Sequence, residues 1–185
     1  PVPRRASAGG GGAGTGDTQC VAGGTVERLP ALVYLRETDF CPTGPELPDL
    51  AEGAARGGGD PLTILHRLME AVHGAVRFEP GPATAALPAA KALAAGAGNS
   101  QDPAHVFIAG ARHLNIPARY VAGYRARDDG EAQVEAPHGR AGALVPNVGR
   151  VAFDAVPQTS PSEQHTPLPL GPAYPCAAPI PRTRL

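Results

Sequence analysis

The chain has 185 residues, enough for one domain with a substantial core. Its formal net charge of −1 gives no support to a nucleic-acid partner or to an anionic membrane surface. No apolar run approaches the roughly 18 residues of a membrane-spanning helix. Aromatic residues make up only 4% and Trp is absent, so the core must consist mainly of Ala, Val and Leu.

Three cysteines lie far apart in the sequence, at Cys20, Cys41 and Cys176. Their odd number and the absence of a CxxC pair indicate neither a structural zinc site nor a disulfide framework. The sequence also contains no GxxxxGK[ST] loop and no HExxH motif, so we expect no metal and no cofactor. Few cysteines and a glycine-rich start without the apolar segment of a signal peptide predict a cytoplasmic location, and Pro1 indicates a fragment or a processed form.

Composition divides the chain into three segments. Residues 1–24 contain a Gly/Ala/Ser run, which predicts a flexible arm. Residues 25–156 hold the periodic apolar patterns and are predicted to form one domain. Residues 157–185 are so rich in Pro that we predict neither helix nor sheet there.

The first half of the domain predicts a strand and two helices. Residues 25–37 are strand-like although Pro30 interrupts them, and 42–56 suit a short helix that three glycines end. Asp60 and Pro61 are typical of a helix start, and an apolar stripe then runs to about residue 77. His66 and His73 lie seven residues apart on this helix, which is not a metal-ligand spacing and predicts surface or capping roles.

A short Ala-rich helix is predicted over 88–95, and a central helix begins near residue 101. Ser100 or Asp102 can cap the central helix, and Pro103 suits its first helical position. One face can be buried, because apolar or small residues recur at helical spacing: Val106, Phe107, Gly110, Ala111 and Leu114.

The second half of the domain predicts antiparallel strands. Residues 115–125 follow the central helix as a turn and a strand, and the charge cluster at 125–131 predicts a solvated hairpin tip. Residues 141–145 and 150–156 predict two strands joined by a turn at 146–149. This order indicates an α+β fold in which the central helix packs on an antiparallel sheet.

The central helix and the strand after it carry a recognisable pattern. Gln101-Asp102, Ala104-His105 and the run from Ile116 to Tyr124 match the Cys-Gln-Asp-x-Ala-His segment and the Ile-Pro-Ala-Arg-Tyr-Val-x-Gly-Tyr strand of bacterial transglutaminase-like domains. The chain therefore resembles this family, which belongs to the papain-like thiol superfamily. The resemblance implies a papain-like core, and Ser100 stands where the family has its catalytic Cys.

The resemblance also implies a catalytic set, in chain order Ser100, His138 and Asp154. Such a site needs a nucleophile at a helix N-terminus, a His that takes its proton and a carboxylate that orients the His. His138 lies just before one predicted strand and Asp154 late in the next. The two residues would be neighbours if these strands pair as a hairpin.

The residues around this set depart from the family pattern. Gly139 and Arg140 follow the His where the family has Ala-Trp, and Ala155 follows Asp154 where the family has Pro. Asn99 is polar where the family has a small apolar residue. These departures indicate a relaxed functional site on an intact scaffold.

Three other candidates receive structural interpretations. His105 matches the family motif but is predicted to pack and to form hydrogen bonds. Asp102 is predicted to interact with the dipole of the central helix. Cys41 lies in a turn with no helix start behind it, so it is not predicted to be a relocated nucleophile.

The Ser in the nucleophile position gives three interpretations of function. In the first, the domain has lost normal thiol catalysis and binds a protein or peptide in its old cleft, because a hydroxyl is far less acidic than a thiol. In the second, Ser100, His138 and Asp154 form a weak amide hydrolase or acyltransferase. In the third, Ser100 replaces the thiol of an active enzyme to trap substrate, which the other departures argue against.

Overall fold

The computed structural model describes residues 30–79, 86–125, 137–158 and 165–171. Its helical elements come first: the 3₁₀ helix η1 (Ala31–Leu35), α1 (Leu47–Ala55), α2 (Pro61–Ala75), α3 (Ala89–Ala95) and α4 (Gln101–His113). The strands of the main sheet follow: β3 (Ala118–Arg125), β4 (Pro137–Val145), β5 (Gly149–Phe153) and β6 (His165–Gly171). Two short strands, β1 (Arg77–Phe78) and β2 (Ala97–Gly98), form a separate parallel pair.

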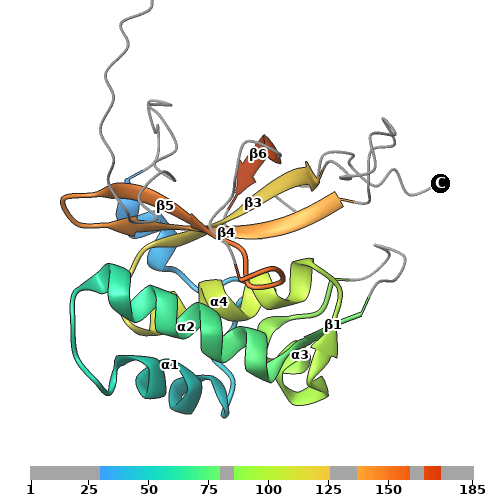
Figure 1. Ribbon diagram of the computed structural model, residues 1–185, viewed down its shortest axis with the longest axis horizontal. Helices are drawn as coiled ribbons and strands as arrows, with labels where there is room; N and C mark the ends of the chain where they lie inside the picture. Colours follow the sequence, from blue (N-terminus) through green and yellow to red (C-terminus); the bar gives the residue numbers. More distant parts are fainter. Residues whose placement is uncertain (1–29, 80–85, 126–136, 159–164, 172–185) are drawn as a thin grey trace, which may run out of the picture.

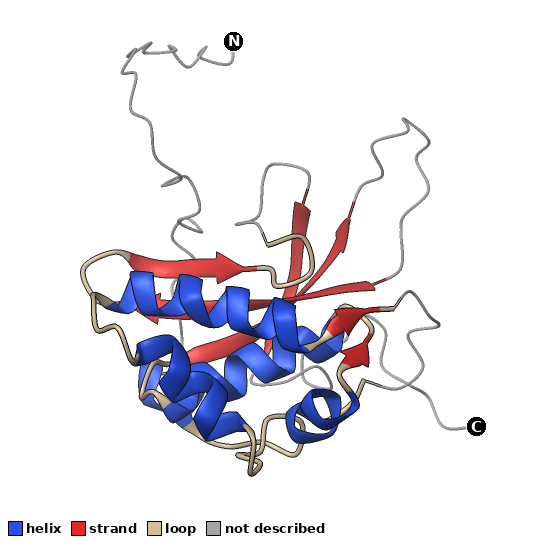
Figure 2. Cartoon of the chain, turned by 60° about the horizontal axis from the view of Figure 1, so that its bottom comes forward, coloured by secondary structure: helices blue, strands red, loops and turns tan. Residues whose placement is uncertain are grey.

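The main sheet has the order β5-β4-β3-β6, and every neighbouring pair in it is antiparallel. All four α-helices lie on one side of this sheet (Figures 1 and 2). The prediction of an α+β fold with a central helix on an antiparallel sheet is therefore confirmed. The hairpin of β4 and β5 is also confirmed, with Ala141 opposite Phe153.

The start of α2 follows the sequence pattern. The Asp60 carboxylate accepts hydrogen bonds from the N–H groups of Leu62 and Thr63, and Pro61 occupies the first turn. This side chain satisfies two of the donors that a helix N-terminus leaves unpaired. The apolar stripe of α2 is buried at Leu65, Leu68, Met69 and Val72.

The central helix is buried on every side. Twelve of the thirteen residues of α4 are buried, because α1, α2 and α3 cover the sides that the sheet does not. The sequence pattern predicted only one buried face, which is too narrow. Gln101, Asp102, His105 and Arg112 were not part of that face, yet each is inside the protein.

Arg112 joins the C-terminal end of α4 to its surroundings. Its Nε donates to the carbonyls of Tyr34 and Ala118, and one terminal nitrogen donates to Ala118 as well. Burial lowers the pKa of the guanidinium from its ordinary value. A cation at this helix end also complements the helix dipole. Arg112 therefore connects η1, α4 and the first residue of β3.

The prediction of a strand over 25–37 is wrong for its described part. Residues 31–35 form η1, and the Val33 N–H donates to the Pro30 carbonyl at 3.0 Å. Pro30 has no N–H to donate to a neighbouring strand, which disfavours a sheet here. Tyr34 is buried, and the guanidinium carbons of Arg119 and Arg150 lie 5.8 and 5.4 Å from its ring centroid.

The prediction that residues 157–185 contain no sheet is wrong for β6. This strand pairs with β3, with Leu170 opposite Val121 and Thr166 opposite Tyr124. Within the described residues β6 lies at one edge of the sheet, and an edge strand tolerates the missing N–H of Pro167 and Pro169. The predicted arm (1–24), most of the charge cluster (126–131) and residues 172–185 lie outside the described residues.

The aromatic contact between α4 and β5 predicts a large stability effect. Phe153 is 1% exposed, and its ring stacks on Phe107 with centroids 4.9 Å apart. We expect Phe153→Ala to lower the free energy of unfolding by about 3–5 kcal/mol, because it removes a buried ring and leaves a cavity. Phe78→Ala is the control, since Phe78 is 44% exposed, and we expect it to cost less than about 1 kcal/mol. Urea unfolding measures both, and equal losses would contradict this account of the core.

Candidate active site

Ser100 occupies the position before α4, but its hydroxyl does not cap the helix. The Asn99 side chain does so, because its Oδ1 accepts from the Gln101 N–H at 2.8 Å. The prediction that Ser100 or Asp102 caps the helix is therefore wrong. The Gly139 N–H of β4 donates to Ser100 Oγ at 3.4 Å, so the hydroxyl lies beside the residue that follows His138.

His138 and Asp154 are brought together by the hairpin of β4 and β5. His138 is the second residue of β4 rather than a residue before it, and Asp154 directly follows β5. The His138 Nε2 and the Asp154 Oδ2 lie 2.6 Å apart, and both side chains are buried. The Val156 N–H donates to the other carboxylate oxygen at 3.2 Å. Both oxygens of Asp154 are thus held in place.

This pairing assigns roles to the two ring nitrogens of His138. A carboxylate oxygen only accepts hydrogen bonds, so Nε2 carries the proton in the bond to Asp154. In a neutral ring Nδ1 is then unprotonated and can accept a proton. The structure therefore brings the three predicted residues into one region, while their catalytic role stays a prediction.

Helix α2 holds the segment on both sides of Asp154. The His73 ring donates through Nδ1 to the Ala155 carbonyl at 2.8 Å. The His66 ring meets Phe153 edge to face, with ring centroids 5.4 Å apart. The sequence assigned both histidines to surface or capping roles, and their spacing gave no signal of a contact this far along the chain.

Asp102 and His105 hold one residue, Leu87, by its backbone. Asp102 Oδ1 accepts from the Leu87 N–H at 2.6 Å, and the His105 Nδ1 lies 3.2 Å from the Leu87 carbonyl oxygen. The other Asp102 oxygen accepts from the Asn99 N–H at 2.8 Å. Asp102 therefore orders the turn before Ser100 rather than acting only on the helix dipole, as the sequence predicted. Leu87 takes part in these hydrogen bonds through backbone atoms alone, so no side-chain pattern could reveal them.

The protonation of this pair follows from burial. Burial lowers the pKa of His105 to about 4, so the ring is neutral at pH 7 and Nδ1–H donates to Leu87. Burial also raises the pKa of Asp102 above its ordinary value, while the hydrogen bonds from the N–H groups of Leu87 and Asn99 lower it. The ring of His105 also contacts those of Phe40 and Tyr120, with centroids 5.2 and 5.3 Å away, which confirms a packing and hydrogen-bonding role for this residue.

Gly139 allows β4 to approach the start of α4. A Cβ built on Gly139 would lie 2.9 Å from the Gln101 Cα and would also overlap the Tyr120 hydroxyl. Real Cβ atoms almost never come this close to backbone, so only Gly fits here without movement. The close approach brings the Gly139 N–H to Ser100.

Cys41 has the properties of a structural cysteine. Its side chain is 1% exposed, and burial raises the pKa of the thiol to about 11. A thiol of this kind is not a nucleophile near neutral pH. Across the part of the chain that the structure describes, no group of three or more His, Cys, Asp or Glu side chains could hold a metal ion.

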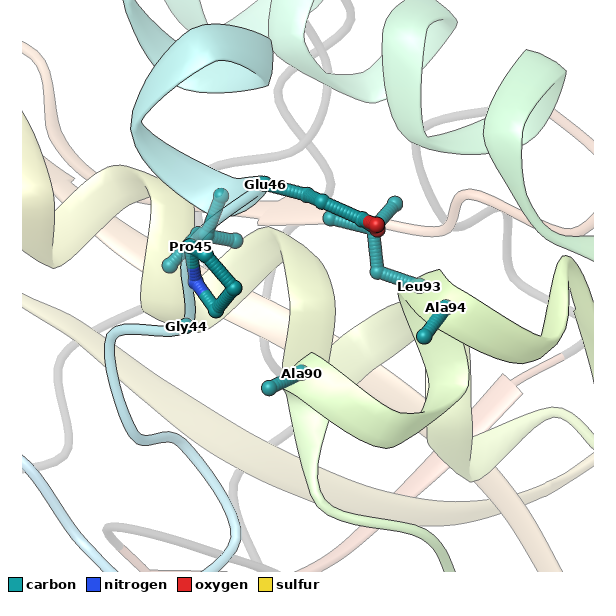
Figure 3. Close-up of a pocket in the computed structure, with 7 residues that line it drawn as sticks. Gly44, Pro45, Glu46, Ala90, Leu93 and Ala94 are labelled. Carbon is teal, nitrogen blue, oxygen red and sulfur yellow. The ribbon is translucent and has the colours of Figure 1, made fainter.

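A small cavity lies between the loop before α1 and helix α3 (Figure 3). Its volume is about 50 Å³, and the residues that line it are Gly44, Pro45, Glu46, Leu47, Ala90, Leu93 and Ala94. This volume is far below the several hundred Å³ of a typical ligand site. None of the predicted site residues lines it, so it is not part of the candidate site.

Comparison with known families identifies the scaffold. The sequence model of the transglutaminase-like superfamily matches residues 48–155, which include Ser100, His138 and Asp154. The chain belongs to the transglutaminase-like superfamily. No match was found among curated protein sequences.

Solved structures with the same transglutaminase-like fold include two bacterial proteins. A presumed cysteine protease from Cytophaga hutchinsonii aligns with a TM-score of 0.64 and 22% identity, over 80% of this chain and 49% of that chain. The periplasmic domain of TgpA from Pseudomonas aeruginosa aligns with a TM-score of 0.54 and 22% identity, over 69% of this chain and 47% of that chain. The chain thus spans about half the length of these proteins, and identities this low show the fold alone.

The location of this transglutaminase-like chain is not decided by these similarities. One of the similar structures is a periplasmic domain, so the cytoplasm stays a prediction. Within the described ranges, none of the helices has the length and apolar character that crossing a bilayer requires.

Burial of His105 predicts a loss of stability in acid. Its folded-state pKa of about 4 lies below the ordinary 6.5, so the folded state binds fewer protons between these values. The titration of His105 leaves the free energy of unfolding unchanged above pH 6.5. As the pH falls from 6.5 towards 4, the unfolded state binds the proton first, and the free energy of unfolding falls by about 3 kcal/mol. His105→Asn keeps a donor near Nδ1 without this titration, so we expect a smaller fall in its unfolding free energy. Urea unfolding across this range measures both, and parallel curves would contradict the assignment.

The close approach at Gly139 predicts a second effect. We expect Gly139→Ala to lower the free energy of unfolding by about 1–3 kcal/mol, because the new methyl group forces β4 away from α4. Gly53→Ala in α1 is the matched control, since a Cβ there meets no atom within 4 Å. It should raise the stability by about 0.5–1 kcal/mol. A stabilised Gly139→Ala variant would refute the tight contact.

Proposed function

We propose that this chain is a transglutaminase-like domain without normal thiol catalysis, which binds a protein or peptide segment at the start of α4. In this proposal Ser100, His138 and Asp154 occupy the positions of a catalytic triad. The observation that supports it best is the buried pair of His138 and Asp154, whose side chains lie 2.6 Å apart. Gly139, the residue after His138, donates its N–H to the hydroxyl of Ser100.

The chemistry of oxygen explains why activity would be impaired. A site of this kind can lower a thiol pKa from about 8.5 to roughly 7 or below, so that the nucleophile is ionised before it attacks. A Ser hydroxyl stays protonated and must transfer its proton to His138 during the attack. The hydrogen bond that Ser100 Oγ accepts from the Gly139 N–H does not remove that proton.

The start of α4 also offers fewer backbone donors than a helix N-terminus usually does. The Gln101 N–H already bonds the Asn99 side chain, and the Asp102 N–H bonds the Asn99 carbonyl at 3.3 Å. Donors that are already paired cannot stabilise the oxyanion of an acyl-transfer intermediate without losing these bonds. Asn99, one of the departures from the family pattern, therefore supports the binding role.

A second candidate function is a weak serine-dependent amide hydrolase or acyltransferase. Ser100 Oγ would attack the carbonyl carbon, its proton would pass to His138 Nδ1, and Asp154 would stabilise the imidazolium. The short bond between His138 and Asp154 favours this alternative, because an oriented His is what a Ser nucleophile needs.

Replacing the hydroxyl with a thiol tests the proposal. In Ser100→Cys we expect iodoacetamide to alkylate the new thiol at about pH 6 roughly tenfold faster than an ordinary thiol, since His138 would stabilise the thiolate. Ser100→Cys/His138→Ala should lose this enhancement. The parent protein is the background control, and Cys41 should remain unlabelled because its pKa is about 11. Peptide mass spectrometry assigns each labelled site.

Each outcome separates the functions. An introduced thiol that behaves like an ordinary one would overturn the retained triad geometry. Fast labelling together with an inactive parent would support the binding role. Labelling of Ser100 in the parent by a fluorophosphonate probe, with amide turnover that His138→Ala abolishes, would instead establish the serine enzyme.

A further inference from the structure

Gln101 has a buried side-chain amide that none of the described residues engages. The residue is 1% exposed, and neither its Oε1 nor its Nε2 has a hydrogen-bond partner among the described residues. Burying an amide without a partner destabilises a folded protein, so such groups are rare and call for an explanation. The other polar side chains within α4 make hydrogen bonds, as Asp102, His105 and Arg112 do.

Gln101 lies next to the candidate active site. It is the first residue of α4 and directly follows Ser100. A Cβ built on Gly139 would lie 2.9 Å from the Gln101 Cα, and the Gly139 N–H contacts Ser100 Oγ. Side chains of a helix tilt towards its N-terminus, so the Gln101 side chain extends towards the Ser100 end of α4.

We propose that the Gln101 amide binds the amide group of the ligand that Ser100 faces. Nε2 donates to the carbonyl oxygen of that ligand, and Oε1 accepts from its N–H. The inference rests on the proposed function and adds a ligand-binding residue to it. A primary carboxamide or a peptide amide supplies both partners, whereas an ester supplies only an acceptor and leaves Oε1 unpaired.

The surrounding backbone explains why a side chain takes this role. The Gln101 N–H is occupied by Asn99 Oδ1, so it is not available to a ligand carbonyl. The positive end of the α4 dipole still favours an oxygen at this place. The Gln101 side chain supplies a donor there, at a site from which water is largely excluded.

Two reagents with and without an amide test this proposal in the Ser100→Cys protein. Iodoacetamide carries a carboxamide, and methyl methanethiosulfonate carries none. In the first reaction a sulfur–carbon bond forms and iodide leaves; in the second a disulfide forms and methanesulfinate leaves. At about pH 9 an ordinary thiol is also largely ionised, so the ratio of the two rates does not depend on thiol activation.

We expect Gln101→Met, added to Ser100→Cys, to lower the iodoacetamide rate relative to the methanethiosulfonate rate about tenfold, because the hydrogen bonds to the carboxamide are lost. The same change should raise the Tm of the parent by roughly 2–8 °C, since it removes a buried unpaired amide. Gln101→Asn, which withdraws the amide by one methylene, is the second variant and should also lower the ratio.

An unchanged ratio in both variants overturns the proposal, as does a thiol that neither reagent reaches. A clear fall in Tm for Gln101→Met also overturns it, because the amide would then have a structural partner. Failure of the proposed function looks different: the introduced thiol would show an ordinary pH dependence, whatever the ratio of the two rates.

Discussion

The burial of α4 on every side is the constraint on which the rest of the structure depends. A helix enclosed by three other helices and a sheet leaves little solvent for its polar side chains, so a partner inside the protein stabilises each of them. Asp102 and His105 find the backbone of Leu87, and Arg112 finds the carbonyls of Tyr34 and Ala118. These bonds connect α4 to segments that are distant in the sequence, and they fix the helix relative to the sheet.

The contacts around the start of α4 fix the geometry of the candidate site. Asp102 holds the Asn99 N–H, and Asn99 in turn caps α4, so the turn that carries Ser100 is determined from both sides. On the opposite side, the absence of a side chain at Gly139 lets β4 approach the helix start. The site therefore lies where the most buried helix meets the strand that carries His138.

Three of the residues that the sequence analysis singled out, Asn99, Ser100 and Gly139, lie together at the start of α4. The Asn99 side chain accepts a hydrogen bond from the Gln101 N–H, and the Ser100 hydroxyl accepts one from the Gly139 N–H. The absence of a side chain at Gly139 narrows the space between α4 and β4. None of them disturbs the pair of His138 and Asp154, which rests on the hairpin register and on contacts from α2. The hairpin and helix α2 thus hold His138 and Asp154, whereas Asn99 and Gly139 determine the surroundings of Ser100.

The sequence by itself determined the elements with strong local signals. The start of α2 at Asp60 and Pro61, the position of α4, the strand after it and the hairpin of β4 and β5 all followed from caps, periodicity and turns, and the family motif indicated the region of Ser100, His138 and Asp154. Only the tertiary structure decided that residues 31–35 form a 3₁₀ helix, that a Pro-rich segment pairs as β6, and that Asn99 rather than Ser100 caps α4. It also decided the roles of Leu87 and His73, because both act through contacts with backbone atoms. Backbone groups are identical in every non-proline residue, so no local pattern can show which of them will be neighbours after folding.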